Sequence, residues 1–247
     1  MAYGLQLFSV RDAAGKDYAA MLQAVADMGY EMVESAGFYG HSAEEVKAML
    51  DKTGLTLIAT HTGYGEVIDR LDETIAYHKA VGCSDIVIPG APLGTKDEVD
   101  AVVEAINRVQ PIIEAAGLNL HYHNHSGEFL PNRDGIVAEY ELIERTNVLL
   151  EIDTFWAYNA GVDPLGLMDK YRDRIRLIHL KDGIPEDLSD PASRPIGKSV
   201  GSGNTPVLAI REKALAYGIQ MIVESEGLDP TGLEESKRCI DFLKSLD

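Results

Sequence analysis

The sequence is poor in cysteine, in basic residues and in long apolar runs. Its two cysteines, Cys83 and Cys239, are too few for a disulfide framework, which favours a reducing compartment. No stretch approaches the roughly 18 uninterrupted apolar residues of a membrane span, and no basic region precedes the short apolar run at the start. These absences predict a soluble, cytoplasmic protein without a signal peptide.

Basic residues are outnumbered by acidic ones. The 247 residues include 22 Lys and Arg against 40 Asp and Glu, a formal net charge of −18, and the positive residues are scattered. Phosphate backbones and anionic membrane surfaces repel such a chain. We therefore expect neither nucleic acid nor a membrane as a partner. The apolar share of 45% is ordinary for a folded globular protein.

Eight short apolar segments alternate with segments of helical periodicity. Each apolar segment is too short for a helix and is bounded by Gly, Pro or polar residues. In chain order they are residues 4–10, 32–35, 55–61, 85–89, 118–123, 148–153, 175–181 and 219–224. Eight strand–helix units over about 250 residues predict an α/β fold, a (β/α)8 TIM barrel that forms one domain over residues 1–247. An open doubly wound sheet is the alternative, but the first strand lacks the Gly-rich loop that such a sheet favours.

Local signals place some of the helix boundaries. Ser42 followed by Glu45 predicts a capping box, and the same signature at Thr95 precedes a helix that ends near Gly117. Pro111 lies inside that helix and is expected to kink or split it. The long irregular stretch 183–206 follows the seventh strand and predicts either a lid over the substrate or a disordered surface insertion.

Polar side chains gather at the carboxyl ends of the predicted strands, where the active site of such a barrel lies. In chain order they are Gln6, Glu34, His61, His121, His123, His125, Glu151, Asp153, His179, Lys181, Glu224 and Glu226. Residues two apart in a strand share a face, so inward-pointing carboxylates and imidazoles of the last four strands would converge at the barrel mouth. Asp153, His179 and Glu224 carry most weight, because an unpaired inward carboxylate is costly.

A divalent cation would remove the mutual repulsion of these carboxylates. Mixed Asp, Glu and His ligation suits Mn²⁺, Mg²⁺, Co²⁺ or Zn²⁺, and the absence of Cys from these strand ends disfavours a structural zinc site. Each residue also has a purely structural alternative. A histidine can be hydrogen-bonded in the core, Glu34 and Glu226 can form rim salt bridges, and Glu151 can merely orient its neighbours. The residues favour a metal site and leave these alternatives open.

Six segments, spread from the first strand to the seventh, carry a more specific pattern. They are Gly4–Asp12, Gly37–Gly40, Tyr122–Phe129, Leu150–Ala157, Ala160–Pro164 and His179–Asp182. Together they resemble the sugar phosphate isomerase/epimerase group of the xylose-isomerase-like TIM barrels, the AP endonuclease 2 superfamily. The YHNH…EF segment and the segment from Asp153 to Pro164 are specific in combination.

The resemblance implies one divalent metal ion held by acidic and histidine side chains from strands five to eight. By position, Asp153, His179 and Glu224 resemble the ligands of strands six, seven and eight. Strand five departs from the pattern, because His123-Asn124-His125 stands where many relatives carry Glu-Asn-His. The missing carboxylate would be replaced by His123 or supplied by Glu128 folding back, and Glu128 is the ligand we favour here.

The implied activity is isomerisation or epimerisation of a keto-sugar or sugar phosphate. A proton next to a carbonyl is removed by Glu224 and returned by Glu128 or His123, through a cis-enediolate. Gln6, Glu34, His61, His125, Trp156 and Lys181 are the residues expected to bind the substrate, with Phe8 and Phe38 as further walls of the pocket.

Other activities are compatible with the same resemblance. An inosose dehydratase, a 3-keto-sugar lyase or hydrolase, and a catalytically inactive sugar-binding barrel are the alternatives. Endonuclease IV belongs to the same superfamily, but the charge of −18 disfavours DNA as a substrate. The expected partner is a small carbohydrate, and a homo-oligomer is compatible with the resemblance.

Overall fold

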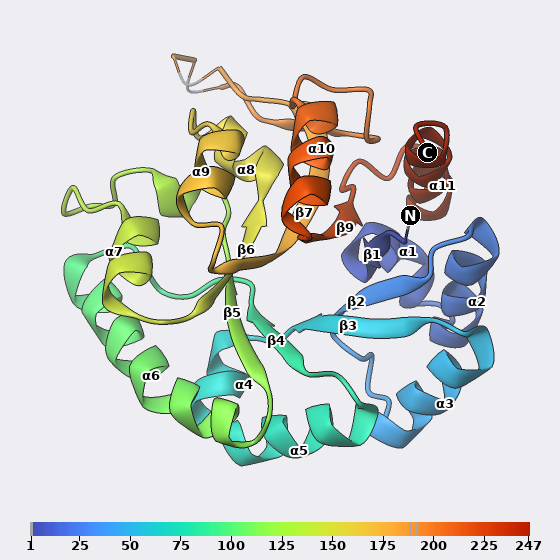
Figure 1. Ribbon diagram of the computed structural model, residues 1–247, viewed down its shortest axis with the longest axis horizontal. Helices are drawn as coiled ribbons and strands as arrows, with labels where there is room; N and C mark the ends of the chain where they lie inside the picture. Colours follow the sequence, from blue (N-terminus) through green and yellow to red (C-terminus); the bar gives the residue numbers. More distant parts are fainter. Residues whose placement is uncertain (1, 188, 191) are drawn as a thin grey trace.

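A closed barrel of parallel strands forms the centre of the computed structural model, which describes residues 2–187, 189–190 and 192–247 (Figure 1). Among these residues the barrel has eight strands, in the order β6-β5-β4-β3-β2-β1-β9-β7, and β6 pairs with β7 to close it. The strands are β1 (Gly4–Gln6), β2 (Met32–Ala36), β3 (Thr56–His61), β4 (Asp85–Ile88), β5 (Asn119–His123), β6 (Leu149–Asp153), β7 (Ile175–Ile184) and β9 (Gln220–Glu224). The predicted (β/α)8 TIM barrel is confirmed.

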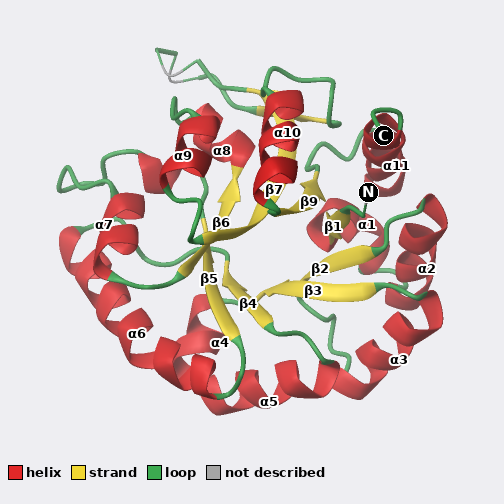
Figure 2. Cartoon of the chain, in the orientation of Figure 1, coloured by secondary structure: helices red, strands yellow, loops and turns green. Residues whose placement is uncertain are grey.

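Helices surround the barrel on its outside (Figure 2). They are α1 (Arg11–Ala14), α2 (Tyr18–Met28), α3 (Ala43–Thr53), α4 (Tyr64–Asp69), α5 (Leu71–Val81), α6 (Lys96–Ala115), α7 (Ala138–Arg145), α8 (Thr154–Asn159), α9 (Pro164–Lys170), α10 (Val207–Tyr217) and α11 (Gly232–Lys244). The Ser42–Glu45 capping box opens α3, and Thr95 caps α6. The α6 helix continues through Pro111 without the expected split, because Pro111 is exposed and water can satisfy the freed carbonyl.

The first strand is shorter than the sequence pattern predicts. It ends at Gln6, and residues Leu7–Val10 form a 3-10 helix, η1. Gln6 causes the change, because its side-chain oxygen accepts a hydrogen bond from the backbone N–H of Phe8 at 3.1 Å. The turn places Phe8 on the barrel rim, where it is 41% exposed.

Inward-pointing side chains form two layers inside the barrel. The lower layer is apolar and packs Ala59, Val87, Leu177 and Ile222 together. Two residues further along their strands stand His61, His179 and Glu224, which belong to the upper, polar layer. The alternation of strand side chains therefore raises the polar residues to the carboxyl end of the barrel and closes the floor below them.

The segment after β7 folds back on the barrel. Strand β7 continues past the barrel to Ile184, and β8 (Ile196–Lys198) pairs with it in antiparallel register. The buried carboxylate of Asp182 accepts four backbone N–H bonds of 2.8–3.1 Å, from residues 183, 201, 203 and 205. A side chain at Gly203 would collide with Asp182. The stretch predicted as a lid or an insertion therefore begins and ends as a β-hairpin, formed by β7 and β8. Positions 188 and 191 lie outside the described residues.

None of the helices in the described residues combines the length and the apolar character that a membrane span needs. The two cysteines are both free and buried.

Candidate metal centre

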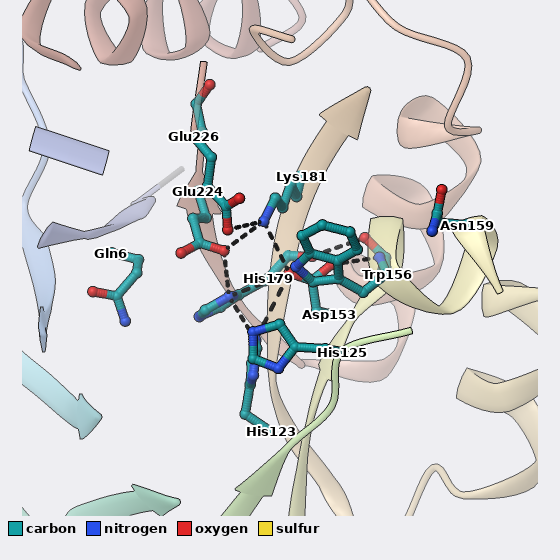
Figure 3. A network of polar contacts seen from close by, with 12 residues as sticks. Gln6, His123, His125, Asp153, Trp156, Asn159, His179, Lys181, Glu224 and Glu226 are labelled. Carbon is teal, nitrogen blue, oxygen red and sulfur yellow. Dashed lines mark hydrogen bonds and ion pairs between the residues drawn. The ribbon is translucent and has the colours of Figure 1, made fainter. Parts of the chain in front are cut away.

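Four side chains from four adjacent barrel strands converge at the barrel mouth (Figure 3). They are His123 of β5, Asp153 of β6, His179 of β7 and Glu224 of β9, all buried, and one ligand atom of each lies within 4.8 Å of the others. The imidazole of His179 lies between the carboxylate of Glu224 and the ring of His123. The convergence follows from strand alternation, because each residue occupies an inward position, and His123, Asp153 and Glu224 are the last residues of their strands.

The distances between these atoms match the edges of a metal coordination shell. Nδ1 of His179 lies 3.1 Å from Nε2 of His123, 3.2 Å from Oε2 of Glu224 and 3.6 Å from Oδ2 of Asp153. Nε2 of His123 lies 3.7 Å from Oδ2 of Asp153. Bonds of about 2.0–2.2 Å from a central ion to N and O ligands separate those ligands by roughly 3.0–3.6 Å. The four atoms are therefore close enough together that they could hold one cation.

The second nitrogen of His179 is held by a carboxylate. Nε2 lies 2.7 Å from Oε2 of Glu34, which also accepts a hydrogen bond from Nε2 of Gln6 at 2.8 Å. A metal-binding histidine characteristically donates its other ring N–H to a carboxylate, which fixes the tautomer and leaves the first nitrogen free for the metal. Glu34 therefore orients His179 so that Nδ1 faces the cluster.

Asp153 has one carboxylate oxygen that accepts a hydrogen bond and one that accepts none, although Nζ of Lys181 lies 3.8 Å from the second. Its Oδ1 accepts the backbone N–H of Trp156 at 2.8 Å and so caps α8. Its Oδ2 is buried and has no hydrogen-bond partner. The amide of Asn124 holds the backbone of Asp153, accepting from its N–H at 3.0 Å and donating to its carbonyl at 3.3 Å. A buried carboxylate oxygen without a donor is costly, and a cation removes that cost.

A second group of polar side chains lies against the first. Nε2 of His61 is 2.9 Å from Oε2 of Glu151 and 3.6 Å from Oε2 of Glu34. Glu34 and Glu151 are both completely buried. Oε2 of Glu151 also lies 3.5 Å from Nε2 of His179. This group surrounds the face of His179 that points away from the cluster, and it holds that ring in place.

Electrostatics prepares the cluster for a cation. Burial lowers the pKa of His123 to about 3, so its ring is neutral, as a metal ligand must be. Burial opposes ionisation of Glu224 and of Asp153, but Lys181 and His179 outweigh it and hold both pKa values below their usual range. Burial also works against a charged His179, but Glu151 and Glu224 raise its pKa well above its usual value. The ring must therefore release a proton when Nδ1 binds a cation.

Lys181 carries a positive charge beside the cluster. Its Nζ lies 3.1 Å from Oε2 of Glu224 and 2.6 Å from Oε1 of Glu226, and 4.5 Å above the ring of Trp156. Burial opposes the charge, and Glu224, Asp153 and Glu226 outweigh it and raise the pKa of the amine. The amine therefore stays protonated over the working pH range.

A chamber of about 390 Å³ opens above the cluster. Its walls are Phe8, Ala36, Gly37, His61, Pro89, His123, His125, Glu224 and Glu226. The volume is in the range of small-molecule pockets, about 300–1000 Å³. A ligand in this chamber would touch both the metal-ligand cluster and the aromatic ring of Phe8.

The sequence matches a known family over most of its length. Residues 22–246 match the family described as Xylose isomerase-like TIM barrel. The chain belongs to the xylose isomerase-like TIM barrel family. This finding confirms the resemblance drawn from the six sequence segments.

Individual relatives of this xylose isomerase-like barrel have more specific names. The structure of a sugar phosphate isomerase/epimerase from Parabacteroides distasonis ATCC 8503 superposes with a TM-score of 0.81 at 26% identity, covering 98% of this chain and 97% of that one. An inosose dehydratase of Geobacillus kaustophilus (strain HTA426) is 26% identical over 187 residues, which is 66% of this chain and 61% of the relative. An inosose dehydratase of Geobacillus thermodenitrificans (strain NG80-2) is 32% identical over 91 residues, 37% of this chain and 30% of the relative. The matched region is less than two thirds of the length of either dehydratase.

The structure of this xylose isomerase-like barrel brings most of the expected site residues together. Asp153, His179 and Glu224 meet in the cluster, and His61 and His125 line the chamber above it. Trp156 and Lys181 stand beside it in contact with each other.

Glu128 is placed differently from the expectation. Glu128 lies outside the groups of side chains that could hold a metal ion among the described residues, and His123 stands at the strand-five position in both of these groups. The carboxylate of Glu128 accepts the backbone N–H of His125 at 3.0 Å and the hydroxyl of Tyr122 at 3.4 Å. Tyr122 precedes His123 on β5 and therefore points to the opposite, outer face. The turn at η2 (Gly127–Phe129) thus directs Glu128 away from the barrel mouth.

Gln6 and Glu34, expected to bind substrate, are completely buried. The side chain of Gln6 is used by Phe8 and Glu34, and Oε2 of Glu34 is used by Gln6 and His179. Neither residue is among those that line the chamber. Their polar atoms instead contact each other and, through Glu34, the ring of His179.

Two positioning residues escaped the sequence analysis. Asn124 fixes the backbone of Asp153, and Asp182 fixes the segment that follows β7. Asn124 directly follows His123 and Asp182 directly follows Lys181 in the sequence. This adjacency to site residues is the signal by which the sequence could have indicated them. Strand alternation points both away from the inward face, so a pattern of inward-facing residues does not include them.

Proposed function

We propose that the protein is a divalent-metal-dependent isomerase or epimerase of a keto-sugar or sugar phosphate. The proposal rests on the four-strand cluster, whose candidate ligand atoms lie within 4.8 Å of one another and whose buried Asp153 Oδ2 accepts no hydrogen bond. The name of the Parabacteroides distasonis relative, at 26% identity across nearly the whole chain, supports the same reaction class.

His123, Asp153, His179 and Glu224 would hold the metal ion. When bound, the ion supplies Lewis-acid polarisation of the substrate carbonyl and offsets negative charge on the substrate oxygens. Oxygen and nitrogen donors without sulfur suit Mn²⁺, Mg²⁺, Co²⁺ or Zn²⁺.

Glu224 is the residue that we assign to proton removal. Its Oε2 contacts His179 and Lys181, while the other oxygen points away from both of them, and the residue lines the chamber (Figure 3). That second oxygen is in position to take a proton from the carbon next to the carbonyl. The charge on the deprotonated substrate would be offset by the ammonium of Lys181.

The other expected proton carriers are less well placed. His123 is engaged in the cluster with a pKa lowered by burial, and Glu128 lies outside the cluster. His61 and His125 line the chamber and would bind substrate hydroxyls, and Phe8 would pack against the apolar face of the sugar.

A dehydratase is the second candidate, and the two inosose dehydratases favour it. Removal of the same proton followed by loss of a neighbouring hydroxyl gives elimination instead of isomerisation. A catalytically inactive sugar-binding barrel would require a broken ligand set. The convergence of all four side chains argues against that alternative.

Deuterium exchange separates these candidates. The metal-loaded enzyme is incubated in D2O with 2-keto-myo-inositol and with 3-keto-glucose, and label and products are followed by mass spectrometry. We expect deuterium to appear on the carbon next to the carbonyl. An isomerase or epimerase would also form an isomer or epimer of the substrate, whereas a dehydratase would form a product that has lost water. Asp153→Asn and Glu224→Gln should each abolish the exchange and weaken metal binding, because both residues are proposed ligands. The exposed Asp173→Asn should leave the exchange and the metal binding unchanged. Full exchange in either of the first two variants refutes the assignment.

A further inference from the structure

A second chamber adjoins the first at the barrel mouth. It has a volume of about 310 Å³ and lies between the loop that follows β2, the end of β3, and the helices α4 and α5. Gly37 and His61 line both chambers, so the two meet at these residues. A substrate that reacts above the metal-ligand cluster and fills only the first chamber would leave this neighbouring space unused.

Aromatic rings form one wall of the second chamber. Phe38 and Tyr77 both line it, with their ring centroids 4.6 Å apart. The Tyr77 hydroxyl is already used, because it donates to the backbone carbonyl of His41 at 3.0 Å. The rings therefore present carbon faces, which suit the apolar face of a ring-shaped ligand.

Charged side chains at the opposite wall define the polarity of the ligand. Glu66, Arg70 and Glu73 all line the chamber. Nη2 of Arg70 is 2.7 Å from Oε1 of Glu66, so the one guanidinium here is already paired. A phosphate would meet two carboxylates and a neutralised cation, which is repulsive. A neutral group with several hydroxyls can donate to Glu66 and Glu73 and accept from Arg70.

We propose that the second chamber binds a second, uncharged sugar ring, so that the substrate is a keto-glycoside whose oxidised ring reacts above the cluster. This inference rests on the proposed function and adds the substrate class to it. His61, at the junction, would lie beside the glycosidic linkage, with the reacting ring toward Glu224 and the distal ring between Phe38 and Glu73.

The test compares one-ring and two-ring probes. Deuterium exchange is measured with 3-keto-glucose and with the 3-keto forms of cellobiose and maltose, in which a second glucose is attached to the oxidised ring. At least one two-ring probe should have a kcat/KM about tenfold above that of 3-keto-glucose, because the distal ring adds an aromatic contact and hydrogen bonds to carboxylates. Equal values for all three probes overturn the inference, and absence of exchange with every probe refutes the proposed function instead.

Variants on α5 provide a matched comparison. Asp72 and Glu73 are neighbouring exposed carboxylates in the first turn of α5, and only Glu73 lines the chamber. Glu73→Ala should remove most of the two-ring preference without changing kcat/KM for 3-keto-glucose, while Asp72→Ala should leave both unchanged. Equal losses for one-ring and two-ring probes in Glu73→Ala contradict the proposed location.

A binding measurement decides the inference even without turnover. Glucose, cellobiose and maltose are titrated calorimetrically into the metal-loaded protein. We expect at least one disaccharide to bind about tenfold more tightly than glucose, and Glu73→Ala to cancel the difference. If neither disaccharide binds more tightly, or if the advantage survives in Glu73→Ala, the second chamber is not the site of a distal sugar.

Discussion

Glu139 gives the most quantitative prediction about the protein. It lies on α7, it is 1% exposed, and its Oε2 has no hydrogen-bond partner. Burial, and secondarily the charge of Glu128, raise the pKa of this carboxyl from the ordinary 4.5 to about 8. The folded protein therefore holds a proton on Glu139 that the unfolded chain has already lost at neutral pH.

The raised pKa has a definite sign for stability. Below pH 4.5 the folded and the unfolded protein both carry the proton, so ionisation of Glu139 does not affect the free energy of unfolding. Between pH 4.5 and 8 only the unfolded protein releases the proton, so stability falls as the pH rises. Each pH unit is worth about 1.4 kcal/mol, so the accumulated cost at pH 7 is about 3 kcal/mol. Glu139→Gln keeps the shape of the protonated acid and removes the ionisation. We expect the variant to be more stable by that amount at pH 7, a rise of roughly 6–12 °C in Tm for a chain of this size.

The measurement is the difference in unfolding free energy between the two proteins at pH 5, 6, 7 and 8. All other titrating groups cancel in that difference, which should grow with pH and level off above pH 8. Glu144→Gln, at an exposed position on the same helix, is the control and should show no such trend. A difference that is independent of pH, or a variant less stable than the parent at pH 7, would refute the reasoning.

Three further predictions concern the site and its supports. Glu34→Gln should weaken metal binding about 10–100-fold, because Glu34 orients His179. Competition with a chelator measures the affinity, and an unchanged affinity would show that the carboxylate does not orient His179. Asp182→Asn should speed backbone hydrogen exchange at residues 201, 203 and 205, because an amide side chain cannot accept all four bonds. Exchange is followed by mass spectrometry, and equal rates in the variant and the parent would contradict this prediction. Removing the metal with EDTA should lower Tm, and re-adding Mn²⁺ at about 100 times its Kd should restore about 3 kcal/mol in the parent but not in Asp153→Asn.

The barrel and its inward cluster were predictable because both follow from short-range periodicity. Alternation in a strand assigns Asp153, His179 and Glu224 to one face, and parallel pairing brings their strand ends to one edge. The end of β1 was not predictable in this way. An apolar pattern from 4 to 10 favours a strand, and the side chain of Gln6 overrides it by capping a turn.

The strand-five ligand shows the limit of sequence reasoning more clearly. His123 and Glu128 are both chemically able to hold a cation, and the choice depends on the path of the turn after β5. That path is fixed by contacts at Tyr122 and at the backbone of His125, which the sequence does not reveal. The second chamber was equally hidden, because Phe38, Glu73 and Tyr77 belong to elements that tertiary packing alone brings together.

The contacts of Asp182 have a consequence for how such barrels can diversify. This one carboxylate fastens both ends of the segment after β7, at residue 183 on one side and at residues 201, 203 and 205 on the other. Lys181, its neighbour in sequence, faces the cluster from the same strand. Insertions and deletions between the two fastened ends would therefore leave the ammonium where it is. The hairpin could therefore be lengthened, shortened or replaced during evolution or by an engineer without displacing Lys181 from the cluster.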